Sequence, residues 1–244
     1  MEMISEAKLR NIAGEKGYNL IFLEKDYFIT ALLFQLKDIE GLFFKGGTTL
    51  NKIFLRHRRL SEDIDFTSTI PIPEVKKRIE QAVELDKAHF RKMEQGNGRA
   101  GFVRIYVYYN SYFWKDARLA IDVNSRATLH LPPERKPIKN FYGLTFTIPT
   151  LNLEELLAEK VRTAITRNQP RDYFDLYFIL KKYEVNLGLA KKKTEEAGET
   201  YDIERIFRNA RTVFSRWDED IGKLTTEKLD FTTCIRFLEK ELRK

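Results

Sequence analysis

The sequence predicts an α+β fold in which a mixed β-sheet with flanking helices is followed by a helical C-terminal bundle. Up to about residue 150, short apolar runs of strand length alternate with helical patterns. From Leu151 onward, only helical patterns occur. This change indicates two domains, one of residues 1–150 and a helical one of residues 151–244.

The elements of the first domain follow from apolar periodicity and from the positions of proline and glycine. Residues 19–38 carry apolar side chains on a broad helical face, which indicates a core helix. Two prolines precede a charged, amphipathic stretch that predicts a helix at 74–93. The other expected elements are strands at 41–44, 60–67, 102–109, 118–123 and 144–148, a helix at 48–56, and loops at 95–98 and 129–142.

The second domain is expected to contain four helices, at 152–167, 170–183, 201–214 and 227–242. A run of three lysines at 191–193 lies between them. Such a run is typical of a solvated loop or helix end.

The composition is that of a folded, intracellular protein. Of its 244 residues, 43% are hydrophobic, which supports a sizeable core. The single cysteine, Cys234, excludes an internal disulfide framework. Charges interrupt the most apolar stretch, so we expect no signal peptide or membrane span and a cytoplasmic protein. The formal net charge of +7 favours polyanionic partners. The three histidines lack the spacing of metal ligands.

The first motif is a paired glycine that follows an apolar run. Residues 44–50 read Phe-Lys-Gly-Gly-Thr-Thr-Leu. Because Gly46 and Gly47 carry no Cβ, the backbone can approach a phosphate chain closely. The helix that follows would present its free N–H groups to an anion. A tight turn without a ligand is the alternative interpretation.

The second motif is a pair of acids one residue apart. Residues 59–66 read Arg-Leu-Ser-Glu-Asp-Ile-Asp-Phe. Side chains alternate along a strand, so Asp63 and Asp65 share one face while Ile64 points to the core. Two such carboxylates form a site for a hard cation such as Mg²⁺. A glycine pair followed by this acid pair is the pattern that nucleotidyl transfer requires, although a solvated strand edge would also place acids outward.

A third acid lies on another predicted strand. In residues 118–123, apolar side chains alternate with others, and Asp122 lies on the opposite face from Ile121. We expect Asp122 to be the third carboxylate of the metal site, supplied by a neighbouring strand. The alternative is an aspartate that pairs with a basic neighbour in the sheet.

The helical region supplies a second candidate group. Lys160 lies on the inward face of the helix at 152–167, so its ammonium needs an anionic partner. That partner is either a triphosphate or the carboxylate of Asp175, and the spacing leaves both open. Asp172 lies on the same side of the next helix as Asp175, and in the first turn it can also complement the helix dipole.

These segments resemble the signature of the AbiEii/AbiGii nucleotidyltransferase toxins, a group within the DNA polymerase β-like nucleotidyltransferase superfamily. The signature reads Lys-Gly-Gly-Thr-(Ser/Ala/Thr)-Leu, a short helix, then Arg-x-Ser-x-Asp-Ile-Asp-(Phe/Leu). Residues 45–50 and 59–66 match it almost letter for letter. Residues 23–28 and the block from Glu159 to Leu180 also resemble family segments. Beyond Leu180 the resemblance is not specific.

The resemblance implies a transfer of NMP from an NTP to an acceptor hydroxyl, with Mg²⁺ or Mn²⁺ as the metal. It implies that residues 1–150 form the catalytic domain. The expected catalytic residues are Asp63, Asp65, Asp122 and Lys160, and the three aspartates are the expected metal ligands. The residues expected around the nucleotide are Lys45, Gly46, Gly47, Thr48, Arg59, Ser61, Lys160, Asp172 and Asp175.

The resemblance also implies a biological role that neither spacing nor composition indicates. It implies an RNA acceptor, with a tRNA 3′ end expected, and the toxin role of a type IV toxin–antitoxin system with a winged-helix antitoxin. Two other functions stay open at this point. The same transfer could use a small molecule or a protein as acceptor, or the chain could be an idle module that binds RNA or a partner. The intact set of three aspartates favours an active enzyme.

Overall fold

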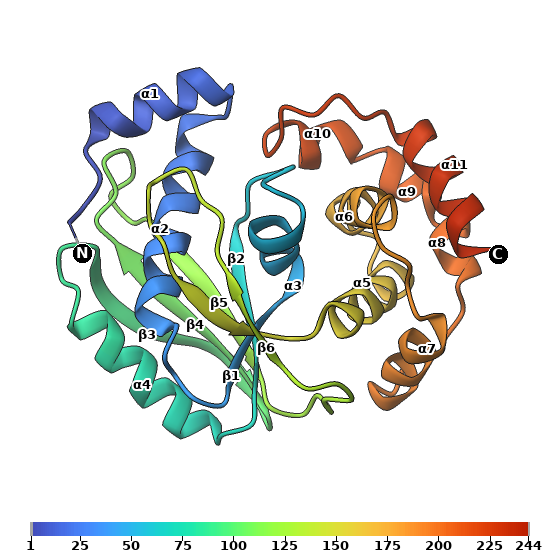
Figure 1. The fold of residues 1–244 in the computed structure, drawn as a ribbon, viewed down its shortest axis with the longest axis horizontal. Helices are drawn as coiled ribbons and strands as arrows, with labels where there is room; N and C mark the ends of the chain where they lie inside the picture. The colour runs from blue at the N-terminus through green and yellow to red at the C-terminus, as the bar shows by residue number, and fades with distance from the viewer. Residues whose placement is uncertain (1, 244) are drawn as a thin grey trace.

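A mixed seven-stranded sheet runs through the N-terminal half of the protein (Figure 1). The structure is a computed structural model that describes residues 2–243. The strands follow the order β3-β4-β5-β2-β1-β7-β6 across the sheet. Their bounds are β1 Leu42–Lys45, β2 Asp63–Ser68, β3 Phe90–Arg99, β4 Phe102–Tyr109, β5 Arg118–Asn124, β6 Glu134–Pro137 and β7 Thr147–Thr150. Together with the flanking helices, this sheet confirms the predicted α+β fold class.

The middle of the sheet brings polar side chains from three strands together. Strand β2 pairs antiparallel with β1 and parallel with β5. The register places Asp65 beside Lys45 on β1 and beside Asp122 on β5. Apolar side chains alternate toward the buried face of β5, so its polar side chains lie on the other face. The parallel pairing of β2 with β5 therefore places Asp65 and Asp122 side by side.

Helices α1 (Glu6–Lys16), α2 (Leu20–Leu36) and α4 (Ile72–Glu84) lie on one side of the sheet (Figure 1). Their apolar side chains and the buried face of the sheet form the first of two hydrophobic cores. On α4 the buried side chains are Val75, Ile79, Ala82 and Val83, a helical spacing that turns one face to the sheet. This layer leaves the other face of the sheet free for the polar side chains.

The C-terminal helices lie on the opposite side and form the second core (Figure 1). They are α5 Leu153–Thr166, α6 Pro170–Leu180, α7 Leu187–Glu196, α8 Glu204–Arg208, α9 Ala210–Phe214, α10 Trp217–Gly222 and α11 Phe231–Leu242. Leu50 and Leu55, which follow the glycine pair, belong to this second core. The segment after the glycines therefore joins the two halves, and the division into two domains at residue 150 stays a prediction.

One predicted helix is wrong in its second half. The helix expected at 74–93 ends at Glu84 in α4, and residues 90–99 form strand β3, which includes the loop expected at 95–98. Strand β3 pairs antiparallel with β4 and lies at the edge of the sheet, with most of its side chains exposed. A polar edge strand lacks the apolar alternation by which strands are recognised, so its pairing partner decided its structure.

Other boundaries also differ from the predicted ones. The loop expected at 129–142 contains the short edge strand β6, which ends in a proline. The helix expected at 201–214 is divided into α8 and α9. Helices α1 and α10 were not predicted from periodicity. In the part of the chain that the structure describes, no helix combines the length and the apolar character needed to cross a membrane.

The lysine run at 191–193 lies toward the end of a helix, one of the two predicted alternatives, with Lys191 and Lys192 exposed. It lies in α7, and Lys193 is buried. The ammonium of Lys193 forms ion pairs with Glu155 and Glu159 of α5. A lysine can be buried when carboxylates neutralise it, and here those carboxylates come from a helix that is distant in sequence.

Candidate active site

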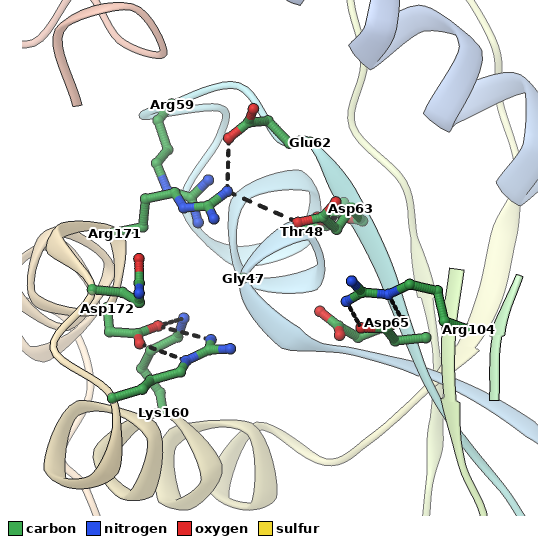
Figure 2. A pocket seen from close by; sticks show the side chains of 13 residues that line it. Gly47, Thr48, Arg59, Glu62, Asp63, Asp65, Arg104, Lys160, Arg171 and Asp172 are labelled. Carbon is green, nitrogen blue, oxygen red and sulfur yellow. Dashed lines mark hydrogen bonds and ion pairs between the residues drawn. The ribbon is translucent and has the colours of Figure 1, made fainter. Parts of the chain in front are cut away.

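A polar pocket of about 280 Å³ lies between the free face of the sheet and helices α5 and α6 (Figure 2). One wall carries acids from the sheet, and the other carries cations from the helical half. The lining residues are Gly47, Thr48, Arg59, Glu62, Asp63, Asp65, Arg104, Asp122, Lys160, Arg167, Gln169, Arg171 and Asp172.

The three aspartates expected as metal ligands all line this pocket. Asp63 and Asp65 are separated by the buried Ile64 on β2, and Asp65 is the register partner of Asp122 on β5. Asp63 lies at the mouth, with 45% of its side chain exposed. The strand alternation inferred from the sequence thus places these side chains on one face.

The carboxylate of Asp65 has no direct partner in the protein. It makes no hydrogen bond or ion pair of contact distance with any residue between 2 and 243. Burial raises the pKa of Asp65 to about 6, and the neighbouring charges of Asp122 and Asp63 add to this rise while Lys45 opposes it. A divalent cation would remove this electrostatic cost.

Asp122 already has a partner. Both of its oxygens accept hydrogen bonds from Arg104 of β4, from Nε at 2.7 Å and from Nη2 at 2.6 Å. The two residues are direct register partners in the antiparallel pair of β4 and β5. This basic neighbour is the alternative partner that the sequence left open for Asp122. The hydrogen bonds to Asp122 raise the pKa of the Arg104 guanidinium.

The donor set suits a hard divalent cation but is not gathered into a three-ligand group. Carboxylate oxygens are the ligands that Mg²⁺ prefers, and the unpaired Asp65 fits such an ion. Among residues 2–243, however, no three His, Cys, Asp or Glu side chains converge closely enough to hold a metal. The pair with Arg104 occupies both oxygens of Asp122. The residues therefore fit the metal chemically, and Arg104 holds the third carboxylate, Asp122, at the wall of the same pocket.

The glycine pair begins helix α3 (Gly46–Thr49) where β1 ends. Gly46 has a φ of 79°, which favours glycine, and a Cβ there would lie 2.2 Å from the carboxylate of Asp65. The missing side chain at Gly46 is therefore required by the packing of Asp65. The hydroxyl of Thr48 donates to the backbone carbonyl of Asp63 at 2.5 Å and fixes the start of β2 to the glycine turn.

A buried ion-pair network supports the turn from behind. Arg59 donates to both oxygens of Asp175, from Nε at 2.9 Å and from Nη2 at 2.7 Å. A Cβ on Gly47 would lie 2.6 Å from Nη2 of Arg59 and 2.9 Å from Oδ2 of Asp175. Burial opposes the charge of Asp175, but Arg59 and Lys160 hold its pKa down at about 2.

Lys160 joins this network to the pocket. Its ammonium donates to Asp172 at 2.9 Å and to Asp175 at 3.0 Å. Arg167 also pairs with Asp172, from Nε at 2.9 Å. An ammonium has three N–H donors, so these two carboxylates leave one donor of Lys160 for an anion in the pocket. The two partners proposed for Lys160 are thus compatible with each other.

A π-helix holds the network in place. Residues Leu50–Phe54 form this π-helix, η1, and its Asn51 is fully buried. The Asn51 amide donates to the Gly47 carbonyl at 3.0 Å and to Asp175 at 2.9 Å, and its oxygen accepts from the backbone N–H of Arg59. π-Helical turns occur frequently at functional sites. The Asn51 amide thus connects the turn at Gly47, the backbone of Arg59 and the carboxylate of Asp175.

The π-helix is itself anchored to the first core. Lys52 is fully buried, and its ammonium lies 2.7 Å from the carboxylate of Asp26 on α2 and 2.9 Å from the Thr30 hydroxyl. Asp26 belongs to the segment at 23–28 that resembles the family. This contact links Asp26 to the site through the π-helix.

The family model for the nucleotidyl transferase AbiEii toxin of type IV toxin–antitoxin systems matches residues 28–239. This match spans most of the chain. The protein belongs to the AbiEii nucleotidyltransferase toxin family. The resemblance inferred from the sequence is therefore confirmed, and the protein is a nucleotidyltransferase by family.

Two solved bacterial structures have a fold similar to that of this chain. MenT4, a nucleotidyltransferase toxin from Mycobacterium tuberculosis H37Rv, superposes with a TM-score of 0.71 at 19% identity, covering 98% of this chain and 88% of that one. JHP933 from Helicobacter pylori gives a TM-score of 0.61 at 18% identity, with 90% of each chain covered. At these identities the likeness concerns the fold alone. No curated protein sequence matches the chain.

Four of the residues expected near the nucleotide do not line the pocket. Lys45 turns to Glu159, 3.1 Å away, and faces a neighbouring cavity. Gly46 lies under Asp65, and Asp175 is fully buried behind Gly47. Ser61 is buried, and its hydroxyl has no hydrogen-bond partner among the described residues. These positions support the pocket from behind, and whether they also affect nucleotide binding stays a prediction.

The sequence reasoning missed several residues of the pocket. Arg104 comes from β4, and Arg167, Gln169 and Arg171 come from the turn between α5 and α6 and the first turn of α6. Arg171 pairs with Glu62 at 2.7 Å, which links α6 to the start of β2 (Figure 2). Residues 110–117, which connect strands β4 and β5, are too many to fix their register, so the sequence alone did not pair Arg104 with Asp122.

Replacing Gly47 with alanine is expected to lower both the melting temperature and the NTP affinity. The added Cβ collides with Arg59, which cannot move aside because two hydrogen bonds to Asp175 hold it. We expect a loss of about 1–3 kcal/mol in the free energy of unfolding. Gly14→Ala in α1 is the matched control, since nothing lies within 4 Å of its Cβ and it should stabilise the helix. Thermal unfolding and NTP titration of both variants check this, and an unchanged Gly47→Ala protein contradicts it.

Proposed function

We propose that this AbiEii-family protein transfers an NMP group from an NTP to a hydroxyl of RNA, with the 3′ end of tRNA as acceptor and Mg²⁺ as the metal. The observation that carries the proposal is the pocket itself. Asp63, Asp65 and Asp122 line one wall, and the opposite wall presents Lys160 together with arginines. Acids that hold cations and cations that hold phosphates are the two parts that such a transfer needs.

The aspartates are the residues that would hold the metal. Asp65 supplies the unpaired charge, and Asp63 supplies a second carboxylate at the mouth of the pocket. Bound Mg²⁺ would neutralise charge on the reacting phosphoryl group and lower the pKa of the attacking hydroxyl. The acceptor hydroxyl would release its proton to solvent as its oxygen bonds to the α-phosphorus. The bond between that phosphorus and the pyrophosphate oxygen would break, and pyrophosphate would leave.

The opposite wall would hold the triphosphate. Lys160 donates to Asp172 and Asp175, which leaves its third N–H for a phosphate oxygen. Arg167 is 59% exposed and extends into the pocket from the same wall. Planar guanidinium groups match phosphate geometry, so Arg167 and Arg171 are suited to the β- and γ-phosphates.

The charge of the protein and its family support the proposed acceptor and partner. The net charge of +7 favours a polyanion such as tRNA over a neutral small molecule. The family belongs to type IV toxin–antitoxin systems, which supports a toxin role and an antitoxin partner. We propose a winged-helix protein as that antitoxin.

A transfer assay with α-labelled NTPs tests the proposal. Each of the four NTPs is offered with Mg²⁺ and with total tRNA, total cell protein or a panel of hydroxylated antibiotics. We expect label on tRNA, removed by digestion of the 3′ end, together with pyrophosphate release. Label on protein or antibiotic instead would correct the acceptor. Absence of label in every arm, under conditions in which NTP binds, would favour the idle binding module.

A further inference from the structure

We infer that Arg104 is a positioning residue that holds Asp122 in place. When a divalent cation binds, the Arg104–Asp122 pair opens, and Asp122 then completes the metal site. The inference rests on the proposed function, because it assumes that Asp63 and Asp65 bind the metal. It assigns a role to a residue that the family signature does not contain.

The geometry of the pair supports this role. Arg104 and Asp122 lie directly opposite each other on adjacent strands, so the backbone fixes them as partners. Two short hydrogen bonds use both oxygens of Asp122. A bidentate guanidinium–carboxylate pair is the strongest form of such a contact and fixes the orientation of the acid. Arg104 therefore keeps the Asp122 side chain on the pocket face.

The same pair competes with a metal for Asp122. Arg104 donates one hydrogen bond to each oxygen of Asp122, so a cation that binds there shares these oxygens with the guanidinium. The guanidinium also repels a divalent cation at short range. The absence of a three-ligand group among residues 2–243 agrees with this competition.

The exposure of the two partners makes the exchange feasible. The side chain of Arg104 is 42% exposed, and that of Asp122 is 20% exposed. The guanidinium can therefore turn into solvent without leaving a buried charge unpaired. The pair Arg59–Asp175 is different, because its side chains are 5% and 0% exposed, and opening it would strand both charges. Opening the Arg104–Asp122 pair therefore costs less free energy than opening the Arg59–Asp175 pair.

Titration with Mn²⁺ in the absence of nucleotide tests the inference, with free Mn²⁺ counted by electron paramagnetic resonance. Arg104→Gln is expected to bind Mn²⁺ at least tenfold more tightly at the site that includes Asp122. Arg104→Lys, which keeps the charge but loses the bidentate contact, should fall between Arg104→Gln and the unaltered protein. The midpoint of Mg²⁺ activation in the transfer assay should move to lower concentration in the same order.

Two further variants separate the possible outcomes. In the double variant with Asp122→Asn, the gain in Mn²⁺ affinity should vanish. Arg118→Gln on the same sheet is the matched control, because Arg118 is an exposed arginine that stacks over Tyr106 and does not line the pocket. Unchanged or weaker Mn²⁺ binding by Arg104→Gln overturns the inference, as does a gain that persists without the Asp122 carboxylate.

The proposed function fails in a distinguishable way. If Asp65→Asn leaves Mn²⁺ binding of the otherwise unaltered protein intact, the metal site itself is wrong. If Asp65→Asn abolishes binding while Arg104→Gln changes nothing, the metal site stands and only the role of Arg104 is refuted. Circular dichroism of every variant confirms that the fold is present before binding is compared.

Discussion

Replacing Asp175 with alanine is expected to lower the free energy of unfolding by about 3–5 kcal/mol. The carboxylate accepts hydrogen bonds from Arg59, Lys160 and the Asn51 amide, and it is fully buried. Its removal leaves the Arg59 guanidinium buried, with 5% of its side chain exposed, and without its charge partner. Urea unfolding at neutral pH measures the loss.

The pH dependence gives this prediction a second readout. The pKa of Asp175 lies at about 2 in the folded protein, below its ordinary value near 4. A depressed pKa contributes stability that is present above the ordinary value and is lost as the pH falls through the folded value. The difference between the unaltered protein and Asp175→Ala should therefore be full at pH 5 and above and should shrink between about pH 4 and pH 2.

An exposed aspartate provides the control. Asp116 lies on the surface between β4 and β5. Asp116→Ala should change the free energy of unfolding by no more than about 0.5 kcal/mol. A loss at Asp175 as small as that at Asp116 would show that the network around Arg59 does not hold the fold together.

Replacing Asp65 with asparagine is expected to reduce transfer by roughly 10³-fold or more, which corresponds to about 4 kcal/mol of transition-state stabilisation. The carboxylate lies at the centre of the acid wall, between Lys45 and Asp122 in the register of the sheet. Asparagine keeps the shape of the side chain but removes the charge that would hold a cation. The labelled-NTP assay measures the loss.

The same variant should be more stable than the unaltered protein in metal-free buffer. Burial and the neighbouring acids raise the pKa of Asp65 to about 6, so at neutral pH its ionised form is unfavourable in the fold. The Asp65→Asn substitution would remove that cost and raise the melting temperature, whereas Asp116→Asn should leave both activity and melting temperature unchanged. A loss of activity together with a lower melting temperature would mean that Asp65 serves the fold rather than the metal.

The opposite effects at Asp65 and Asp175 follow from their partners. Both are aspartates next to the glycine turn, yet Asp175 is paired with Arg59 and Lys160 while Asp65 makes no such pair within the described chain. A paired buried charge stabilises the fold, and an unpaired one is retained at a cost. The cost at Asp65 is a physical reason to assign it to function.

The local chemistry of the site could be predicted from the sequence because it depends on local rules. Strand alternation determines that Asp63 and Asp65 share a face, and the structure places both in the pocket. The absence of a Cβ makes Gly46 and Gly47 the positions of close approach, and both are close-packed. Helical spacing turns Lys160 inward, and it lies on the pocket wall. Each of these inferences needs only the neighbours of a residue along the chain.

The tertiary structure alone decided which groups those residues meet. Arg104 faces Asp122 because β4 pairs with β5 in one register, and Lys45 turns to Glu159 because folding brings α5 within reach of the end of β1. Strand β3 exists because an edge of the sheet was open to a polar segment. Sequence patterns fix the direction of a side chain relative to its own helix or strand. The partner of a charge, and therefore its pKa and its role, depends on segments that only folding brings together.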